Sequence, residues 1–240
     1  MSVDGMPLPA WKHSLPGGTG YPADAKAWNR WYTENDKSWS PASSTLRTAL
    51  NGVVPGRALD LGAGDGRNAV WLAGRGWHVT AMDFSAAALE IGRERAFAEG
   101  VTTLIDWTVA DAVTCTPAPG SLDLVLAAFL HLPAPDLREV ISRTVPALRP
   151  SGAFLYIGHD PADPREGTAG ARDPSILHTH TEVAAWVRDT GLRIETAEIR
   201  SRPVPGARRP ALDCMVLARS ARPVPPAPLS PSNTEREVQS

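Results

Sequence analysis

The sequence predicts an α/β fold built on a mostly parallel β-sheet with helices on both faces. Short apolar runs, typical of buried strands, alternate along the chain with segments of helical periodicity. Five such β-α units in a row require a parallel sheet covered by helices. The last two apolar runs are joined only by a loop rich in proline and glycine, without a crossover helix. The final strand is therefore expected to be antiparallel.

The elements follow from the local patterns, in chain order. Strands are expected at 57–62, 77–84, 103–111, 121–129, 152–160, 191–200 and 211–219. Helices are expected at 66–75, 86–99, 135–148 and 180–190. Ser85 is placed to cap the second helix, and Pro146 falls inside the third pattern, whose last turn should be kinked or broken. Together these elements make a Rossmann-like sheet of seven strands, mostly parallel, with an antiparallel final strand.

Composition places the expected domain within the chain. The chain has 240 residues, enough for one domain with a full core. Residues 1–24 are rich in glycine and proline, and residues 220–240 are proline-rich and polar. Neither segment buries enough apolar surface to offset its ordering entropy, so a flexible N-terminal segment and a disordered tail are expected. The folded domain is then expected over 25–219.

Charge and cysteine usage limit the classes of partner. The formal net charge is −2, and the only local basic cluster, between Arg200 and Arg209, is modest and interpreted as solvated surface. No nucleic-acid partner is therefore expected. No apolar run approaches the ~18 residues of a membrane span, and no signal pattern opens the sequence. Two cysteines are too few for a disulfide framework, which favours a cytoplasmic location. We expect a monomer or homodimer without a membrane partner.

The sharpest motif is ALDLGAGDGR at 58–67, in the turn from the first strand to the first helix. Open α/β sheets bind ligands at this edge, and glycines let a ligand approach the backbone closely. Its spacing is G-x-G-x-G, whereas the dinucleotide fingerprint G-x-G-x-x-G would need glycine in place of Arg67. Asp60 and Asp65 suit a ligand with a cationic amino group and disfavour a pyrophosphate.

Acidic residues also end the next two strands. Asp83 ends the second strand, at the place where a carboxylate accepts hydrogen bonds from ribose hydroxyls. Asp111 ends the third strand, where it can accept from an adenine amino group while the Ala112 backbone N–H faces a ring nitrogen. Three successive strands that end in an acid at one sheet edge favour a nucleoside attached to an amino acid as ligand.

These motifs carry a resemblance to a known family. ALDLGAGDGR, VTAMDFS, VADA and LDLVLAAFLHL, in this order and spacing, resemble the class I S-adenosylmethionine (SAM)-dependent methyltransferases over residues 28–219. The segment Trp28-Asn29-Arg30-Trp31-Tyr32, followed by Trp39, is similar to the tellurite-resistance and thiopurine-type branch. In that branch an N-terminal helix with aromatic residues covers the cofactor, which implies a lid at 25–45. Trp31 is a departure, since the branch usually has arginine there.

The resemblance implies SAM as cofactor and S-adenosylhomocysteine (SAH) as product. It implies that Gly62 and Gly64 face the methionine part, that Asp83 binds the ribose, and that Asp111 and Ala112 bind the adenine. The expected cofactor-binding residues are Asp60, Gly62, Ala63, Gly64, Arg67, Asp83, Phe84, Asp111, Ala112, Ala128, Trp28, Tyr32 and Trp39.

The methyl acceptor decides which catalytic groups are needed. Methyl transfer mainly requires alignment of the nucleophile, and a general base is needed only where the nucleophile carries a proton. Candidate catalytic residues are His131, after the fourth strand, and His159 and Asp160, which end the fifth. Their spacing allows His159 to be polarised by the carboxylate of Asp160. No metal site is predicted. A small-molecule acceptor is expected: a thiol, halide or metalloid, as the branch implies, or a hydroxyl or amine of a secondary metabolite.

Two other functions compete with methyl transfer. An NAD-dependent oxidoreductase is disfavoured by the glycine spacing, the acidic loop and the antiparallel final strand. A SAM-binding regulatory protein without catalytic activity is compatible with the same cofactor residues, because a fold and a site do not dictate a reaction. Separate titrations with SAM and NAD distinguish methyl transfer from the oxidoreductase. Formation of SAH distinguishes it from the regulatory protein.

Overall fold

The computed structural model describes residues 24–34, 40–162, 174–203 and 209–221. The two terminal segments that the sequence predicts to be flexible lie almost entirely outside these residues, as does Trp39. None of the described helices is both long and apolar enough to cross a membrane.

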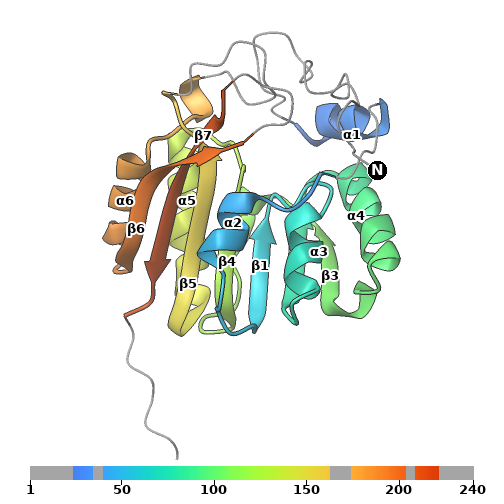
Figure 1. Ribbon diagram of the computed structural model, residues 1–240, viewed down its shortest axis with the longest axis horizontal. Helices are drawn as coiled ribbons and strands as arrows, with labels where there is room; N and C mark the ends of the chain where they lie inside the picture. Colours follow the sequence, from blue (N-terminus) through green and yellow to red (C-terminus); the bar gives the residue numbers. More distant parts are fainter. Residues whose placement is uncertain (1–23, 35–39, 163–173, 204–208, 222–240) are drawn as a thin grey trace, which may run out of the picture.

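A single seven-stranded sheet runs through the middle of the protein, in the order β3-β2-β1-β4-β5-β7-β6 (Figure 1). Strands β1 to β5 are parallel, whereas β7 is antiparallel to both of its neighbours, β5 and β6. The strand bounds are β1 Arg57–Leu61, β2 His78–Asp83, β3 Ile105–Val109, β4 Leu122–Ala128, β5 Leu148–His159, β6 Arg193–Arg202 and β7 Ala211–Arg219. The predicted fold class is confirmed. The insertion of β7 between β5 and β6 was not predicted.

Helices cover both faces of the sheet. Their bounds are α1 Ala25–Glu34, α2 Ser44–Ala49, α3 Arg67–Ala73, α4 Ala86–Ala98, α5 Ala134–Thr144 and α6 His180–Asp189. Buried residues of α2, α3 and α4 share one apolar cluster with Leu124 and Leu126 of β4. Those of α5 and α6 share another with Val125 and Ala127. Successive residues of a strand point to opposite faces, so β4 supplies both cores.

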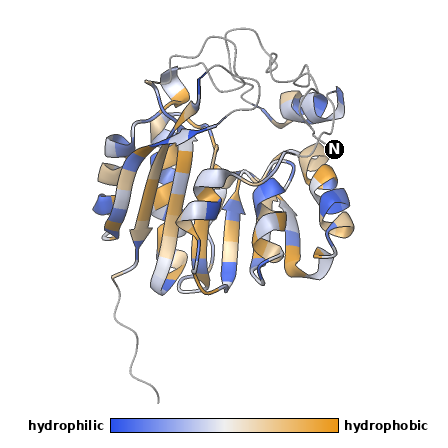
Figure 2. Ribbon diagram, in the orientation of Figure 1, coloured by the Kyte–Doolittle hydropathy of each residue, from blue (hydrophilic) through white to orange (hydrophobic). Residues whose placement is uncertain are grey.

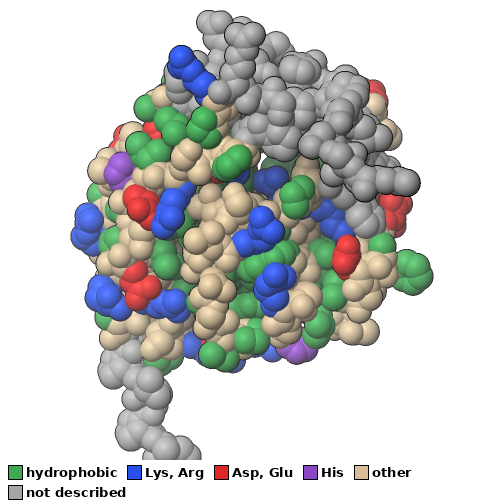
Figure 3. All heavy atoms as spheres, viewed as in Figure 1, with side chains coloured by type: hydrophobic (Ala, Val, Ile, Leu, Met, Phe, Trp, Pro, Cys, Tyr) green, Lys and Arg blue, Asp and Glu red, His purple; other side chains and the backbone are tan. Residues whose placement is uncertain are grey.

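Apolar and charged residues separate as this layering requires. The central strands are hydrophobic along most of their length, and hydrophilic residues gather on the outer helices (Figure 2). On the face drawn in Figure 3, basic and acidic side chains are interspersed with polar and apolar ones. Both cysteines, Cys115 and Cys214, are buried free thiols.

Pro146 ends the helix before β5. The α-helix stops at Thr144, and residues 145–147 form one 3₁₀ turn before β5 begins at Leu148. Proline lacks the N–H and clashes with the preceding turn, so the expected break is confirmed. The predicted helix end at 148 and strand start at 152 were wrong, because the chain enters the sheet directly after the broken turn. Helix α2, capped by Ser43, was also not predicted.

Candidate functional site

The loops after β1, β2 and β3 are tied together at the carboxyl edge of the sheet. The Asp83 carboxylate accepts hydrogen bonds from the Gly64 N–H (2.9 Å) and the Ser85 N–H (2.8 Å). The Ala110 N–H, next to Asp111, donates to the Asp83 carbonyl oxygen (3.1 Å). The structure therefore brings the glycine loop, Asp83 and Asp111 to one edge, as the sequence reasoning required.

Asp60 is a buried carboxylate with an unused oxygen. Its side chain is 1% exposed, and its Oδ2 has no hydrogen-bond partner among the described residues. Burial raises the pKa of Asp60 to about 7, against the opposing effect of the Arg67 guanidinium. A buried carboxylate oxygen without a donor is costly unless a ligand supplies one. This oxygen is therefore suited to a cationic amino group.

Asp65, the other acid of the glycine loop, is already paired. Its Oδ2 lies 2.9 Å from Nη2 of Arg95, whose side chain is 5% exposed. Arg95 also donates to the carbonyl oxygen of Ser40 (3.4 Å), the first residue of the described stretch 40–162. Asp65 thus fixes the loop to α4 and leaves the amino-group role proposed from sequence to Asp60.

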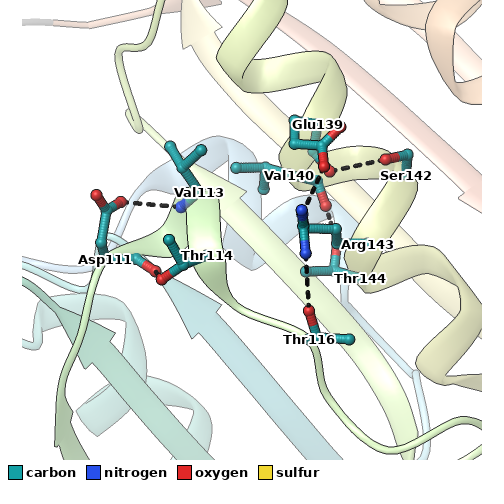
Figure 4. A network of polar contacts seen from close by, with 9 residues as sticks. All are labelled: Asp111, Val113, Thr114, Thr116, Glu139, Val140, Ser142, Arg143 and Thr144. Carbon is teal, nitrogen blue, oxygen red and sulfur yellow. Dashed lines mark hydrogen bonds and ion pairs between the residues drawn. The ribbon is translucent and has the colours of Figure 1, made fainter.

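Asp111 caps its own turn at the end of β3 (Figure 4). Its Oδ1 accepts from the Val113 N–H (2.9 Å), and the Thr114 hydroxyl donates to its backbone carbonyl (3.1 Å). The carboxylate is exposed, with its second oxygen outside these hydrogen bonds, whereas Ala112 is buried as the first residue of the turn. The geometry leaves one Asp111 oxygen for a ligand at this edge.

The glycine loop adopts a left-handed backbone, with φ of +66° at Gly62, +54° at Gly64 and +70° at Gly66. A Cβ on Gly64 would lie 2.7 Å from the Tyr32 hydroxyl, so α1 lies directly over this residue. The left-handed backbone favours glycine at this position, and a Cβ there would require the Tyr32 side chain to shift. The Ala63 N–H donates to the Met82 carbonyl and holds the loop against β2 (2.9 Å).

Helix α1 is anchored by a residue that sequence reasoning did not assign. The Asn29 Oδ1 accepts from the Ser85 hydroxyl (2.9 Å) and from the Ala87 N–H (3.0 Å) at the start of α4. Half-buried Trp28, Trp31 and Tyr32 pack on one another, with ring centroids 4.8 to 5.8 Å apart. The sequence signal that could have identified this anchor was a polar asparagine among the aromatic residues of the predicted helix. This placement sets α1 against the glycine loop and the start of α4.

We predict that Asn29→Ala weakens SAM binding about 3- to 10-fold, because two hydrogen bonds worth roughly 1 kcal/mol in total hold α1 over the loop. Isothermal titration calorimetry measures the change. The control is Thr33→Ala, which removes only a hydrogen bond inside α1. Equal affinities for the Asn29 variant and the wild type would contradict the lid assignment.

The edge beside β4 combines a strained aromatic residue with two arginines. Phe129 has a φ of +61°, uncommon for a bulky side chain and typical of functional sites. The Arg67 Cζ lies 5.1 Å from the centre of its ring, and the Arg202 Cζ lies 5.6 Å away. Arg67 therefore stands between the glycine loop and the ends of β4 and β6.

The two candidate catalytic histidines meet beside Phe129. The rings of His131 and His159 stack with their centroids 5.1 Å apart, and His159 lies 4.9 Å from the Phe129 ring. Burial lowers the pKa of His159, and lowers that of His131 well below its ordinary value. At neutral pH both imidazoles are neutral.

His159 is paired with Asp213 and not with Asp160. The His159 Nδ1 lies 3.5 Å from Oδ1 of Asp213 on β7. Asp160 instead accepts from the Ala162 N–H (2.9 Å) and donates its own N–H to the Leu212 carbonyl. Adjacent strand residues point to opposite faces, so neighbours in sequence cannot form the expected pair.

Asp213 and Arg202 were missed as site residues. Arg202, interpreted from sequence as solvated surface, is half-buried and donates to both oxygens of Asp213 (2.6 and 3.1 Å). The signal was a lone aspartate within the apolar run ALDCMVLAR, since a buried carboxylate needs a partner. Of the remaining predicted residues, Phe84 is half-buried after β2 and Ala128 is buried at the end of β4.

The comparisons with known proteins agree with this architecture. Residues 58–152 match the family described as "Methyltransferase domain". The chain is 32% identical over 121 residues to a demethylmenaquinone methyltransferase of Clavibacter sepedonicus, a match that covers 50% of this chain and 47% of the relative. It is 33% identical over 97 residues to methyltransferase GfsG of Streptomyces halstedii, covering 40% and 35%. The matched region thus spans less than half the length of either relative.

Among solved structures, TehB from Haemophilus influenzae is similar with a TM-score of 0.60 and 17% identity, over 81% of this chain and 66% of TehB. At this identity the likeness concerns the fold alone.

Proposed function

We propose that this chain, whose residues 58–152 match the family described as "Methyltransferase domain", is a class I SAM-dependent methyltransferase that transfers the methyl group of SAM to a small molecule. The observation that supports the proposal most is the unused, buried oxygen of Asp60 beside the left-handed glycine loop. It lies at the edge where Asp83 ends β2 and where Asp111 follows the end of β3. When bound, SAM supplies a methyl group on a positively charged sulfur, which the acceptor attacks.

The residues at this edge fit the parts of SAM. Asp60 receives the amino group of the methionine part, together with the Gly62 carbonyl. Asp83 accepts hydrogen bonds from the ribose hydroxyls, while the Gly64 and Ser85 N–H groups hold its carboxylate in place. Asp111 and Ala112 contact the adenine. Ala63, Arg67, Phe84 and Ala128 line the same site, and Trp28 and Tyr32 of α1 close it.

The finer assignment is to the tellurite-resistance and thiopurine-type branch. Helix α1, with its aromatic cluster and its contact with Gly64, supports this assignment. The branch favours thiols, halides or metalloid oxyanions as acceptors, whereas a secondary-metabolite hydroxyl or amine is the alternative. The two groups differ in whether the enzyme must remove a proton.

The experiment that tests the proposal is SAM binding by Asp83→Ala. The variant loses a carboxylate whose hydrogen bonds to the ribose are worth roughly 1.5–3 kcal/mol, so we expect SAM affinity to fall about 10- to 150-fold. Isothermal titration calorimetry with SAM and with SAH measures this change. A loss below twofold would remove Asp83 from the cofactor site.

The same preparation separates methyl transfer from the competing functions. Stabilisation against heat by SAM but not by NAD excludes the oxidoreductase, because a ligand that binds only the folded state raises the melting temperature. SAH formation with any acceptor excludes a regulatory protein that merely binds SAM.

A further inference from the structure

We propose that His159 is the general base of this enzyme, that Asp213 is its positioning residue, and that the acceptor is therefore a hydroxyl compound. This inference rests on the proposed methyl transfer and selects the acceptor class within it. It follows from a linked set of side chains on three strands that converge at one end of the sheet.

The first step is the fixed orientation of the His159 ring. Asp213 Oδ1 faces Nδ1 at 3.5 Å, and the ring is held between His131, stacked at 5.1 Å and 15°, and Phe129. A carboxylate at Nδ1 favours the tautomer with the proton on Nδ1, which leaves the lone pair on Nε2. The side chain of His159 keeps 13% exposure, so the imidazole is not sealed inside the core.

The second step is the cost of placing Asp213. Its side chain is fully buried on β7, and a buried carboxylate is stable only with strong partners. Arg202 supplies two hydrogen bonds from β6 and thereby fixes the carboxylate below the imidazole. Arg202 alone would be enough to neutralise Asp213. The second contact, with His159, is the one that a merely structural ion pair does not need.

The third step is the charge around the imidazole. Asp213 faces it from β7, Arg202 from β6, Arg67 from the glycine loop, and neutral His131 from the loop after β4. Burial and the two arginines lower the pKa of His159, although Asp213 opposes them. The imidazole is therefore neutral near pH 7 and able to accept a proton.

The reaction balances with these groups. As the acceptor oxygen forms a bond to the methyl carbon, the carbon–sulfur bond breaks and its electron pair stays on sulfur. The hydroxyl proton moves to Nε2 of His159, and the resulting imidazolium is stabilised by Asp213. Solvent takes the proton when the products leave. A general base in this position contributes roughly 10²- to 10⁴-fold in rate.

The same arrangement narrows the acceptor class. A thiolate, a halide or a metalloid oxyanion has no proton to lose and would leave the His159–Asp213 pair without a task. A phenol or enol needs the proton removed as its oxygen attacks. Arg67 and Arg202, on either side of Phe129, also favour an acceptor that bears an acidic group.

The first test is the tautomer of His159 in the whole protein without acceptor, read by ¹⁵N NMR of histidine-labelled protein at pH 7.5. His159→Gln assigns the resonance. We expect Nδ1 to be protonated and Nε2 to be free. A proton on Nε2, or a cationic ring, would overturn the proposal because neither form accepts a proton there. In Asp213→Asn the pKa of His159 should fall further, since a favourable charge is lost.

The second test measures SAH formation with a panel of phenols and enols and with their thiol counterparts. The matched pair of probe acceptors in this panel is 4-hydroxybenzoate and 4-mercaptobenzoate. His159→Gln should slow methylation of hydroxyl compounds at least 50-fold and of thiols less than threefold. SAH affinity should stay within threefold of the wild type. Asp123→Asn is the matched control for Asp213→Asn, since it also removes an arginine-paired aspartate, from the opposite edge of the sheet.

Exclusive methylation of thiols, or a loss below threefold with hydroxyl acceptors, would overturn the proposal. If no member of the panel reacts, the tautomer of His159 measured in the first test decides whether the proposal stands. Failure of the proposed function is seen separately, as absence of SAM and SAH binding in the wild type.

Discussion

Asp60→Asn should stabilise the protein at pH 8 by about 2 kcal/mol and destabilise it at pH 4 by about 1–2 kcal/mol. In the folded protein the pKa of Asp60 is raised from 3.8 to about 7 by burial. Between these values the folded state binds more protons than the unfolded state, so the free energy of unfolding falls as pH rises. Three pKa units correspond to about 4 kcal/mol, from which the cost of burying an amide N–H₂ is subtracted.

Urea denaturation at pH 4, 6 and 8 measures this difference. Asp106→Asn is the control, because it removes the same charge from an exposed position of β3 and should change stability by less than about 0.5 kcal/mol. The Asp60 variant should also bind SAM more weakly, since it no longer offers an anion to the amino group. If the difference in unfolding free energy between the variant and the wild type were the same at pH 4, 6 and 8, ionisation of Asp60 would not destabilise the folded protein.

Gly66→Ala should destabilise the protein by about 2–4 kcal/mol. Gly66 has a φ of +70°, which costs a residue with a Cβ roughly 1–2 kcal/mol. A Cβ there would lie 2.5 Å from the Trp107 ring and 3.1 Å from the Cα of Gly92. Overpacking of this kind adds roughly 1–3 kcal/mol. Thermal or urea denaturation measures the loss.

Gly100→Ala separates the two contributions. Gly100 has nearly the same φ, +69°, but a Cβ there would meet no atom within 4 Å. The Gly100→Ala variant should therefore lose only about 1 kcal/mol of unfolding free energy, the cost of the backbone conformation. In the background of Trp107→Leu, Gly66→Ala should become less damaging. If Gly66→Ala and Gly100→Ala lose the same stability, the contact with Trp107 has no energetic role.

The third glycine of the loop thus shows where sequence reasoning reached its limit. The motif gave the position of the turn correctly, because a buried strand followed by closely spaced glycines is a local pattern. It did not reveal that Gly66, before α3, and Gly92, in α4, make room for Trp107 on β3. Such a packing requirement depends on tertiary contacts that spacing does not encode.

The proximity of the three acids at the proposed cofactor edge was more predictable than the contacts of the candidate catalytic residues, for the same reason. Asp60, Asp83 and Asp111 lie at or just after the carboxyl ends of three neighbouring parallel strands, and parallel strands bring these ends to one edge. The partner of His159 depends on β7 lying beside β5, with His159 opposite Asp213. Strand order and register across a hairpin are not local properties, and the sequence favoured the adjacent residue Asp160 instead.

Calorimetric titration of the wild-type protein with SAH and then of Asp83→Ala tests the central claim most directly. We expect one SAH per chain in the wild type and an affinity 10- to 150-fold lower in the variant. Absence of SAH binding to the wild type, or equal affinity in both proteins, would contradict the claim that this sheet edge holds SAM.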